Sequence, residues 1–158
     1  MSNSFPRPSH KEFAEVAPDV YAAMIALGDA LTASGLDVEL TELVKIRVSQ
    51  INNCAFCLQY HLNIARRIGV DAAKLDLVAT WREAGIFTAR EMAALSWAEQ
   101  VTNCAKHSGR DDAWAELARH FSSSEAVFLT VAIATINTWN RLSGAFHFAP
   151  PIPEREGA

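Results

Sequence analysis

The sequence predicts an all-α fold, and three observations support this prediction. Apolar residues recur at helical spacing along most of the chain, capping-box patterns open several of these segments, and no segment alternates as a half-buried strand would. At 158 residues with 50% hydrophobic content, the chain suits one domain with its own core. We therefore expect a single domain over residues 1–158, with its core over about 9–147 and an extended or disordered tail over 148–158.

Residues that favour helix ends set the expected boundaries of a bundle of about six to seven helices. A capping box at Ser9 opens a short first segment, which Pro18 interrupts, and Gly35 stops the second segment. The stretch TWREAGIF, residues 80–87, is expected to be an irregular turn. In chain order, the patterns indicate eight helical segments, one more than the upper estimate for the bundle. They cover about 9–17, 18–35, 38–51, 54–69, 71–79, 88–107, 112–121 and 122–142.

Polar caps also place the later segments. Asp37 can cap the third segment, and further capping boxes begin at Thr88 and Ser122. The dipeptide Asn52-Asn53 breaks the third segment, and we expect Asn53 to be the N-cap of the helix that follows.

Charge and hydropathy exclude two classes of partner. The net charge is -4 with a sequence pI near 5.7, and no Lys/Arg stripe is present, so we expect no nucleic-acid partner. Residues 1–13 have no apolar core of a signal peptide, and the longest apolar run, 126–136, contains two threonines. We therefore expect a cytoplasmic protein with no membrane partner, whose thiols stay reduced.

The stretch NNCAFCLQYHLNIARRIG, residues 52–69, contains two of the three cysteines. With Asn53 as N-cap, Cys54 lies in the first turn, where unpaired N–H groups and the helix dipole lower the pKa of a thiol. Cys57 is three residues on and can form a disulfide with Cys54. His61 is four residues beyond Cys57, so its imidazole can reach the Cys57 sulfur and exchange a proton with it.

Glu42 in the preceding helix completes a candidate proton relay. It lies nine residues before Ile51, about 14 Å along its helix, and His61 lies eight residues past Asn53, about 12 Å along its own. If the two helices fold back on each other, the carboxylate and the imidazole lie at nearly the same height. The carboxylate could then orient or protonate the histidine.

Other interpretations stay open at this point. Cys54, Cys57, Cys104 and His107 could form a Cys3His zinc site, with His61 as a substitute ligand. We rank this second, because CAFCLQYH continues straight into a helix, whereas structural CxxC knuckles sit in tight turns. A non-enzymatic thiol redox sensor is a third interpretation. Trp139, Asn140 and Arg141 could line a pocket, but such a cluster fits packing between subunits equally well.

The pattern Glu42, eleven residues, Cys54-x-x-Cys57-x-x-x-His61 resembles the signature of the alkylhydroperoxidase D-like (AhpD-like) branch of the carboxymuconolactone decarboxylase family. The flanking helices match over roughly forty residues, and INTWNRLSGAF, residues 136–146, resembles the final helix of short members. The resemblance implies an all-helical subunit that assembles into trimers or hexamers. The four tryptophans also favour a homo-oligomer, because one small core does not need so many large aromatic side chains and some of them can pack between subunits.

The resemblance further implies a thiol-dependent peroxidase or disulfide reductase. Cys57 would be the peroxidatic thiol, Cys54 its resolving partner, and Glu42 with His61 the proton relay. The substrate would be a small hydroperoxide, and the protein would hold no cofactor but use an external dithiol, of lipoyl type. The chain departs from the family pattern at Phe56, where characterised members have a second histidine. True carboxymuconolactone decarboxylases lack the cysteine pair, so their reaction is not expected.

Overall fold

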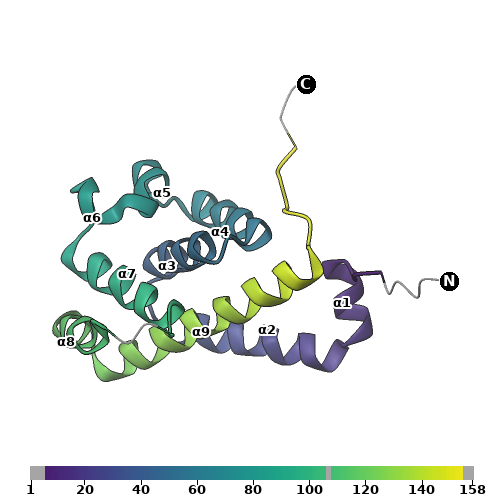
Figure 1. Ribbon diagram of the computed structural model, residues 1–158, viewed down its shortest axis with the longest axis horizontal. Coiled ribbons are helices and arrows are strands. Elements are labelled where there is room, and N and C mark those ends of the chain that lie inside the picture. The colour runs from purple at the N-terminus through teal and green to yellow at the C-terminus, as the bar shows by residue number, and fades with distance from the viewer. Residues whose placement is uncertain (1–5, 106–107, 155–158) are drawn as a thin grey trace.

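The computed structural model describes residues 6–105 and 108–154, and the regular secondary structure within these ranges is helical (Figure 1). The prediction of an all-α fold is therefore confirmed. The α-helices are α1 (His10–Val16), α2 (Pro18–Ala33), α3 (Val38–Ile51), α4 (Ala55–Ile68), α5 (Ala72–Leu77), α6 (Trp81–Ala84), α7 (Ala89–Thr102), α8 (Arg110–His120) and α9 (Ser123–Phe146), with a 3-10 turn, η1 (Val78–Thr80), between α5 and α6.

The described residues form more helices than the expected six to seven, and several boundaries differ. The expected irregular turn over 80–87 contains α6, which is too short for a periodicity to detect and is held by the buried Trp81. The helix that begins after Thr88 ends at Thr102, not near His107, which lies outside the described residues. The last helix continues past Leu142 to Phe146, where His147 in the left-handed conformation ends it.

Helix α3 lies at the centre of the fold and packs against α4, α7 and α9 (Figure 1). Most of its apolar side chains are almost fully buried, as expected for a core helix, namely Leu40, Leu43, Val44, Ile46 and Val48. The core residues exposed by less than 2% are contributed mainly by α3, α7 and α9, and they include Leu43, Val44, Ile46, Val48, Leu95, Leu129 and Ile133.

A tight connection joins α3 to α4 and brings their side chains together. Asn52 follows the last residue of α3, Asn53 adopts a positive φ of 52°, and the Cys54 N–H donates to the Ser49 carbonyl at 3.0 Å. The chain therefore turns back within three residues, and α4 runs beside α3. The prediction that Glu42 and His61 lie at similar distances from the turn assumed that the two helices run side by side in this way.

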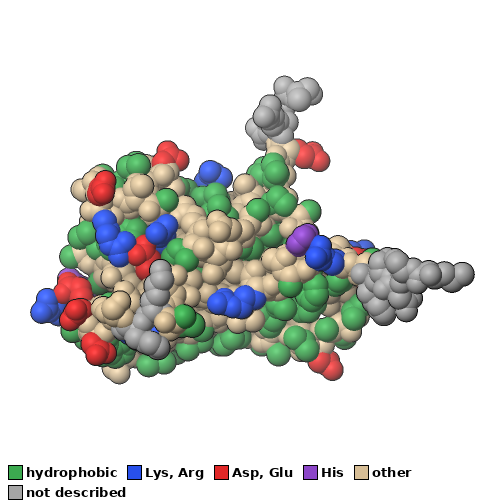
Figure 2. Space-filling model, viewed as in Figure 1, with side chains coloured by type: hydrophobic (Ala, Val, Ile, Leu, Met, Phe, Trp, Pro, Cys, Tyr) green, Lys and Arg blue, Asp and Glu red, His purple; other side chains and the backbone are tan. Residues whose placement is uncertain are grey.

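The hairpin of α1 and α2 is attached differently, since α2 packs against α1 and α9 but none of its own residues is buried. Apolar side chains gather on the surface where α2 lies (Figure 2). Within the described residues, no single helix is long and apolar enough to cross a membrane. The pair α1 and α2 meets that test by length and composition only when the two are taken together, and they are bent by 112°.

The tail after α9 has no regular secondary structure over residues 148–154, and its beginning packs onto the fold. Phe148 is buried against the aromatic rings of α1, and Asn63 donates a hydrogen bond to the Pro151 carbonyl at 2.8 Å. The packed region thus includes Phe148, just beyond the expected core limit of 147. The assignment of the whole chain to one domain stays a prediction.

Candidate active site

The two cysteines of the CxxC motif lie at the start of α4, and both are free thiols with little exposed surface. Cys54 is exposed by 5% and Cys57 by 2%. Cys54, not Asn53, is the N-cap of α4, and its Sγ accepts a hydrogen bond from the Cys57 N–H at 3.3 Å. The boundary shifts by one residue because Asn53 takes the left-handed conformation that reverses the chain. As N-cap, the Cys54 sulfur replaces the oxygen of a serine or aspartate.

Two polar residues of α9 contact the cysteine pair from behind. The Ser143 Oγ lies 3.4 Å from the Cys57 Sγ, and both residues are buried. The amide of Asn140 also hydrogen-bonds toward the sulfurs and lowers the pKa of each thiol. Asn140 is itself held in place, because it donates to Ser49 at 3.2 Å and accepts from Asn52 at 2.8 Å.

Sequence reasoning named Asn140 only as a possible pocket residue and missed Ser143. Their signal is a buried polar face on an otherwise apolar helix, since Asn137, Asn140 and Ser143 follow one another at spacings of three. Buried polar side chains at such positions need partners, and the thiols supply one of them.

The two thiols have opposite pKa shifts. A hydrogen bond from the Cys57 thiol, aided by the Cys57 N–H, lowers the pKa of Cys54 to about 6 against the effect of burial. The same hydrogen bond, in which Cys57 is the donor, together with burial, raises the pKa of Cys57. These directions favour a singly protonated pair, with the proton on Cys57 and the negative charge on Cys54. The low pKa that the helix N-terminus predicts for Cys54 agrees with this direction.

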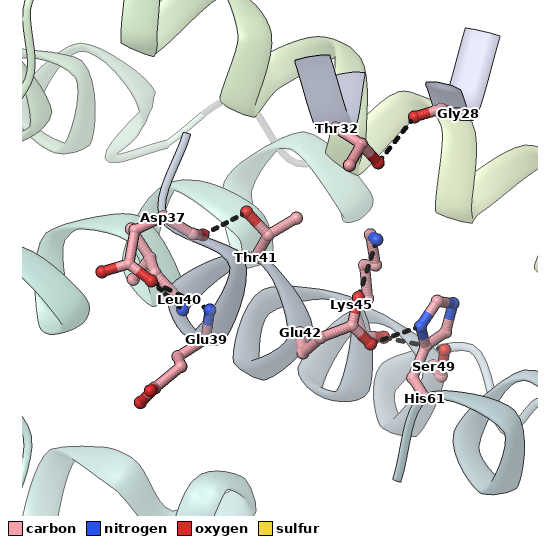
Figure 3. A network of polar contacts seen from close by, with 10 residues as sticks. All are labelled: Gly28, Thr32, Asp37, Glu39, Leu40, Thr41, Glu42, Lys45, Ser49 and His61. Atoms are coloured by element: carbon pink, nitrogen blue, oxygen red, sulfur yellow. Dashed lines mark hydrogen bonds and ion pairs between the residues drawn. The ribbon is translucent and has the colours of Figure 1, made fainter. Parts of the chain in front are cut away.

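Glu42 and His61 meet across the α3–α4 hairpin, as their heights predict (Figure 3). The Glu42 Oε2 lies 2.7 Å from the His61 Nδ1, and the Glu42 Oε1 accepts from the Lys45 Nζ at 2.8 Å. Burial raises the pKa of the Glu42 carboxyl, but the hydrogen bonds and charges of His61 and Lys45 outweigh it, so that the pKa lies below its usual range. Glu42 therefore remains a carboxylate that fixes the ring of His61 and leaves the Nε2 free for chemistry.

His61 was expected to reach the Cys57 sulfur, but the two side chains only line the same cavity and do not contact each other through a hydrogen bond. Within the described residues, no hydrogen bond joins His61 to Cys57, and the Cys57 sulfur is instead hydrogen-bonded to Ser143. Both side chains line the same cavity of ≈ 190 Å³. A small molecule in this cavity could therefore contact the Cys57 sulfur and the imidazole together.

Apolar side chains form most of the cavity wall, and Cys57 but not Cys54 belongs to it. The wall combines residues of α1, α2, α3, α4 and α9. Besides Cys57, its polar side chains are those of Lys45, Thr135, the two histidines and the two tyrosines. The lining residues are His10, Tyr21, Met24, Ile25, Gly28, Leu31, Lys45, Phe56, Cys57, Tyr60, His61, Ala132, Thr135, Ile136 and Trp139. Such a mainly apolar pocket with a few convergent polar groups is typical of a small-molecule site.

The zinc interpretation has less structural support. Within residues 6–105 and 108–154, no group of three or more His, Cys, Asp or Glu side chains is arranged to hold a metal ion. Cys104 is exposed beyond the end of α7 and lines a separate hollow with Asn137 and Arg141. His107 lies outside the described residues. The structure thus brings together Glu42, His61 and the CxxC pair, and places Cys104 elsewhere.

Comparisons with known proteins agree with this fold. The protein YdfG of Bacillus subtilis (strain 168), itself uncharacterised, is 32% identical over 129 residues, which cover 82% of this chain and 88% of YdfG. A crystal structure of an Agrobacterium tumefaciens protein of unknown function, whose description suggests the antioxidant defence protein AhpD, has a TM-score of 0.87 and 37% identity. The match covers 94% of this chain and 100% of that chain.

A more distant structure carries a different named activity. The debrominase Bmp8 without ligand has a TM-score of 0.79 at 23% identity, over 86% of this chain and 73% of that chain, which shows a shared fold alone. The profile of the carboxymuconolactone decarboxylase family matches residues 18–100, which include Glu42, both cysteines of the motif and His61. On this match and the likeness to YdfG, the chain belongs to the carboxymuconolactone decarboxylase family, with an AhpD-like fold.

Proposed function

We propose that the protein is a thiol-dependent peroxidase, which reduces a small hydroperoxide with its CxxC pair and is restored by an external dithiol. One observation carries the proposal. A buried Cys57, hydrogen-bonded to a second cysteine, faces the same apolar cavity as a histidine whose other ring nitrogen is held by a buried carboxylate. This combination supplies a nucleophile, a base and a resolving thiol in one place.

The first step is the removal of one proton from the cysteine pair when both thiols are protonated. His61 accepts it from Cys57 at the cavity, while Glu42 stabilises the imidazolium that forms. The proton of Cys54 then remains in the pair. At rest it lies on Cys57, and when a substrate is bound it returns along the hydrogen bond to Cys54. Cys57 then carries the negative charge at the sulfur that the cavity exposes.

The second step is the attack on the peroxide. The Cys57 thiolate forms an S–O bond with one oxygen, the O–O bond breaks, and the leaving oxygen takes a proton and departs as an alcohol or as water. The product is a sulfenic acid on Cys57. The Cys54 sulfur attacks it, an S–S bond forms, and the hydroxyl leaves as water with the Cys54 proton. A dithiol of lipoyl type then reduces the disulfide by two exchange steps and becomes a cyclic disulfide.

The exposed apolar surface of α2 also supports association of the chain with itself. Val20 and Leu27 are exposed although α2 is one of the most apolar helices, and exposed apolar surface of this kind is typical of an interface. We propose a homo-oligomer, a trimer or a hexamer, working in the cytoplasm, where thiols stay reduced. A monomer in sedimentation at micromolar concentration would contradict the assembly.

Turnover distinguishes the peroxidase from the alternatives. With cumene hydroperoxide and excess dihydrolipoamide, we expect continuous consumption of peroxide, and none with a Cys57→Ser variant. Consumption that stops after one equivalent per chain would favour a redox sensor. One tightly bound zinc per chain, with thiols that do not react with peroxide, would favour the Cys3His site.

A further inference from the structure

A second histidine lies in the cavity wall, and the cycle above leaves it unused. His10 is the first residue of α1, and a capping box fixes the helix start, with Ser9 accepting from the Glu12 N–H at 3.2 Å and the Ser9 N–H donating to Glu12 at 2.7 Å. His10 lines the cavity together with Cys57 and His61. It comes from a part of the chain distant from the CxxC helix.

Aromatic rings hold the His10 imidazole in position. The ring centroids of Phe56, Phe148, Tyr21 and Trp139 lie 5.1, 5.3, 5.7 and 6.1 Å from that of His10. These four rings come from α4, the tail, α2 and α9, so the histidine is packed from several sides. A ring that is held this firmly at a cavity wall can present a nitrogen to a ligand at a fixed place.

Among the described residues, the ring nitrogens of His10 have no hydrogen-bond partner, so they can meet such a ligand. Across residues 6–105 and 108–154, no side chain or backbone group forms a hydrogen bond with them, whereas His61, His120 and His147 each have a partner. His10 is half-buried, and burial lowers its pKa. The imidazole is therefore a titratable group with an unoccupied polar edge in an apolar cavity.

The attack on a peroxide needs a proton donor on the far side of the O–O bond. The sulfur, the attacked oxygen and the leaving oxygen lie nearly in line, so the leaving oxygen points away from Cys57. His61 belongs to the same helix as Cys57, one turn further on, and Lys45 is committed to Glu42 at 2.8 Å. Among the described cationic or imidazole groups of the wall, this leaves His10 to serve the leaving oxygen.

We propose that His10 is a catalytic residue that donates a proton to the oxygen leaving from the hydroperoxide, while His61 takes the proton of Cys57. The proposal rests on the proposed peroxidase function. The transferred proton converts the alkoxide into an alcohol, and His10 recovers a proton from solvent before the next cycle. The two histidines thereby divide the acid and base tasks that a single imidazole would otherwise perform in sequence.

The identity of the leaving group tests the proposal. A peracid releases a carboxylate, which needs no proton, whereas cumene hydroperoxide releases an alkoxide, which does. The rate to measure is that of single-turnover oxidation of the reduced protein. His10→Phe should lower this rate by about a hundred- to ten-thousand-fold with cumene hydroperoxide. With perbenzoic acid, the factor by which the rate falls should be less than about a tenth of that. His10→Gln should show the same selective loss, because its amide cannot transfer a proton.

Alkylation supplies the control for packing and folding. The rate with iodoacetamide, whose iodide leaves without a proton, should be unchanged in both variants if the cysteine pair and the cavity are intact. His120→Gln on α8, outside the cavity, should match the wild-type protein with every reagent.

Three results would overturn the role of His10. Equal losses with both peroxides would mean that the ring only shapes the cavity, and unchanged rates with both would mean that it does nothing in the reaction. If the alkylation rate fell by the same factor as the rate with cumene hydroperoxide, His10 would have only a structural role in the site. A wild-type protein inert to both peroxides would instead contradict the peroxidase function itself, and would be seen before any variant is made.

Discussion

The two helical hairpins that meet at the cavity are built in opposite ways. Seven of the 14 residues of α3 are buried, whereas none of the 16 residues of α2 is. The α3–α4 hairpin carries Glu42, His61 and the cysteine pair in dense packing, and the α1–α2 hairpin supplies His10 and an apolar wall. We infer from this difference that the two hairpins have separate roles. The buried α3–α4 hairpin holds the thiols and the proton relay in place, and the exposed α1–α2 hairpin forms the wall around the substrate.

The largest expected effect concerns the cysteines of the buried hairpin. Cys57→Ser should abolish peroxide turnover, since it removes the sulfur that faces the cavity. Cys54→Ser should still form one sulfenic acid per chain at Cys57, which a dimedone-type trap and peptide mass spectrometry would detect. If Cys54→Ser did not react with peroxide at all while Cys57→Ser did, the peroxidatic role would belong to Cys54, where the resting charge lies.

The proton relay is expected to give the next largest effect. Glu42→Gln and His61→Ala should each slow peroxide turnover, by about a hundred- to ten-thousand-fold for a positioned acid–base group. The double variant should lose little more than the worse single variant, because the two residues are joined by a 2.7 Å hydrogen bond and act as a unit. Full activity of Glu42→Gln, measured with dihydrolipoamide as reductant, would make Glu42 a structural charge only.

Stability measurements compare the hairpins directly. Leu43 is 1% exposed, so Leu43→Ala should lower the free energy of unfolding by about 2–5 kcal/mol at any protein concentration. Leu27 is 42% exposed, so Leu27→Ala should cost less, and its cost should depend on protein concentration if α2 lies between copies of the chain. Urea unfolding at two protein concentrations measures both, and an equal, concentration-independent cost would remove the contrast between the hairpins.

The smallest expected effect concerns the contact between Ser143 of α9 and the cysteine pair. The Ser143 hydroxyl lowers the pKa of both thiols, so Ser143→Ala should move the midpoint of the alkylation rate upward from its value near 6. One hydrogen bond to a thiolate corresponds to about one pKa unit or less. Thr138→Ala, which removes an exposed hydroxyl from the same helix, is the matched control and should leave the midpoint unchanged. A midpoint that stays near 6 in Ser143→Ala would remove Ser143 from the site.

The parts of this account that the sequence predicts are those that depend on short separations along the chain. The caps at Ser9, Thr88 and Ser122 form as expected, because a capping box joins residues three apart. The meeting of Glu42 and His61 was also predictable, since a single tight turn links their helices and fixes their relative heights.

Contacts between distant segments were not predictable in this way. Ser143 reaches Cys57 across 86 residues, and its place depends on how α9 packs behind α4. His10 enters the cavity because Tyr21, Phe56 and Trp139 surround it, which no local pattern encodes. The shift of the N-cap from Asn53 to Cys54 likewise follows from the backbone conformation of the turn.

The central claim is that peroxide converts the cysteine pair into a disulfide. The most direct measurement is a thiol count on a Cys104→Ser variant, which removes the exposed third cysteine and leaves only Cys54 and Cys57. One equivalent of cumene hydroperoxide should remove both thiols of each chain, peptide mapping should find a Cys54–Cys57 disulfide, and dihydrolipoamide should restore both thiols. Two thiols that remain titratable after the peroxide treatment would contradict the account.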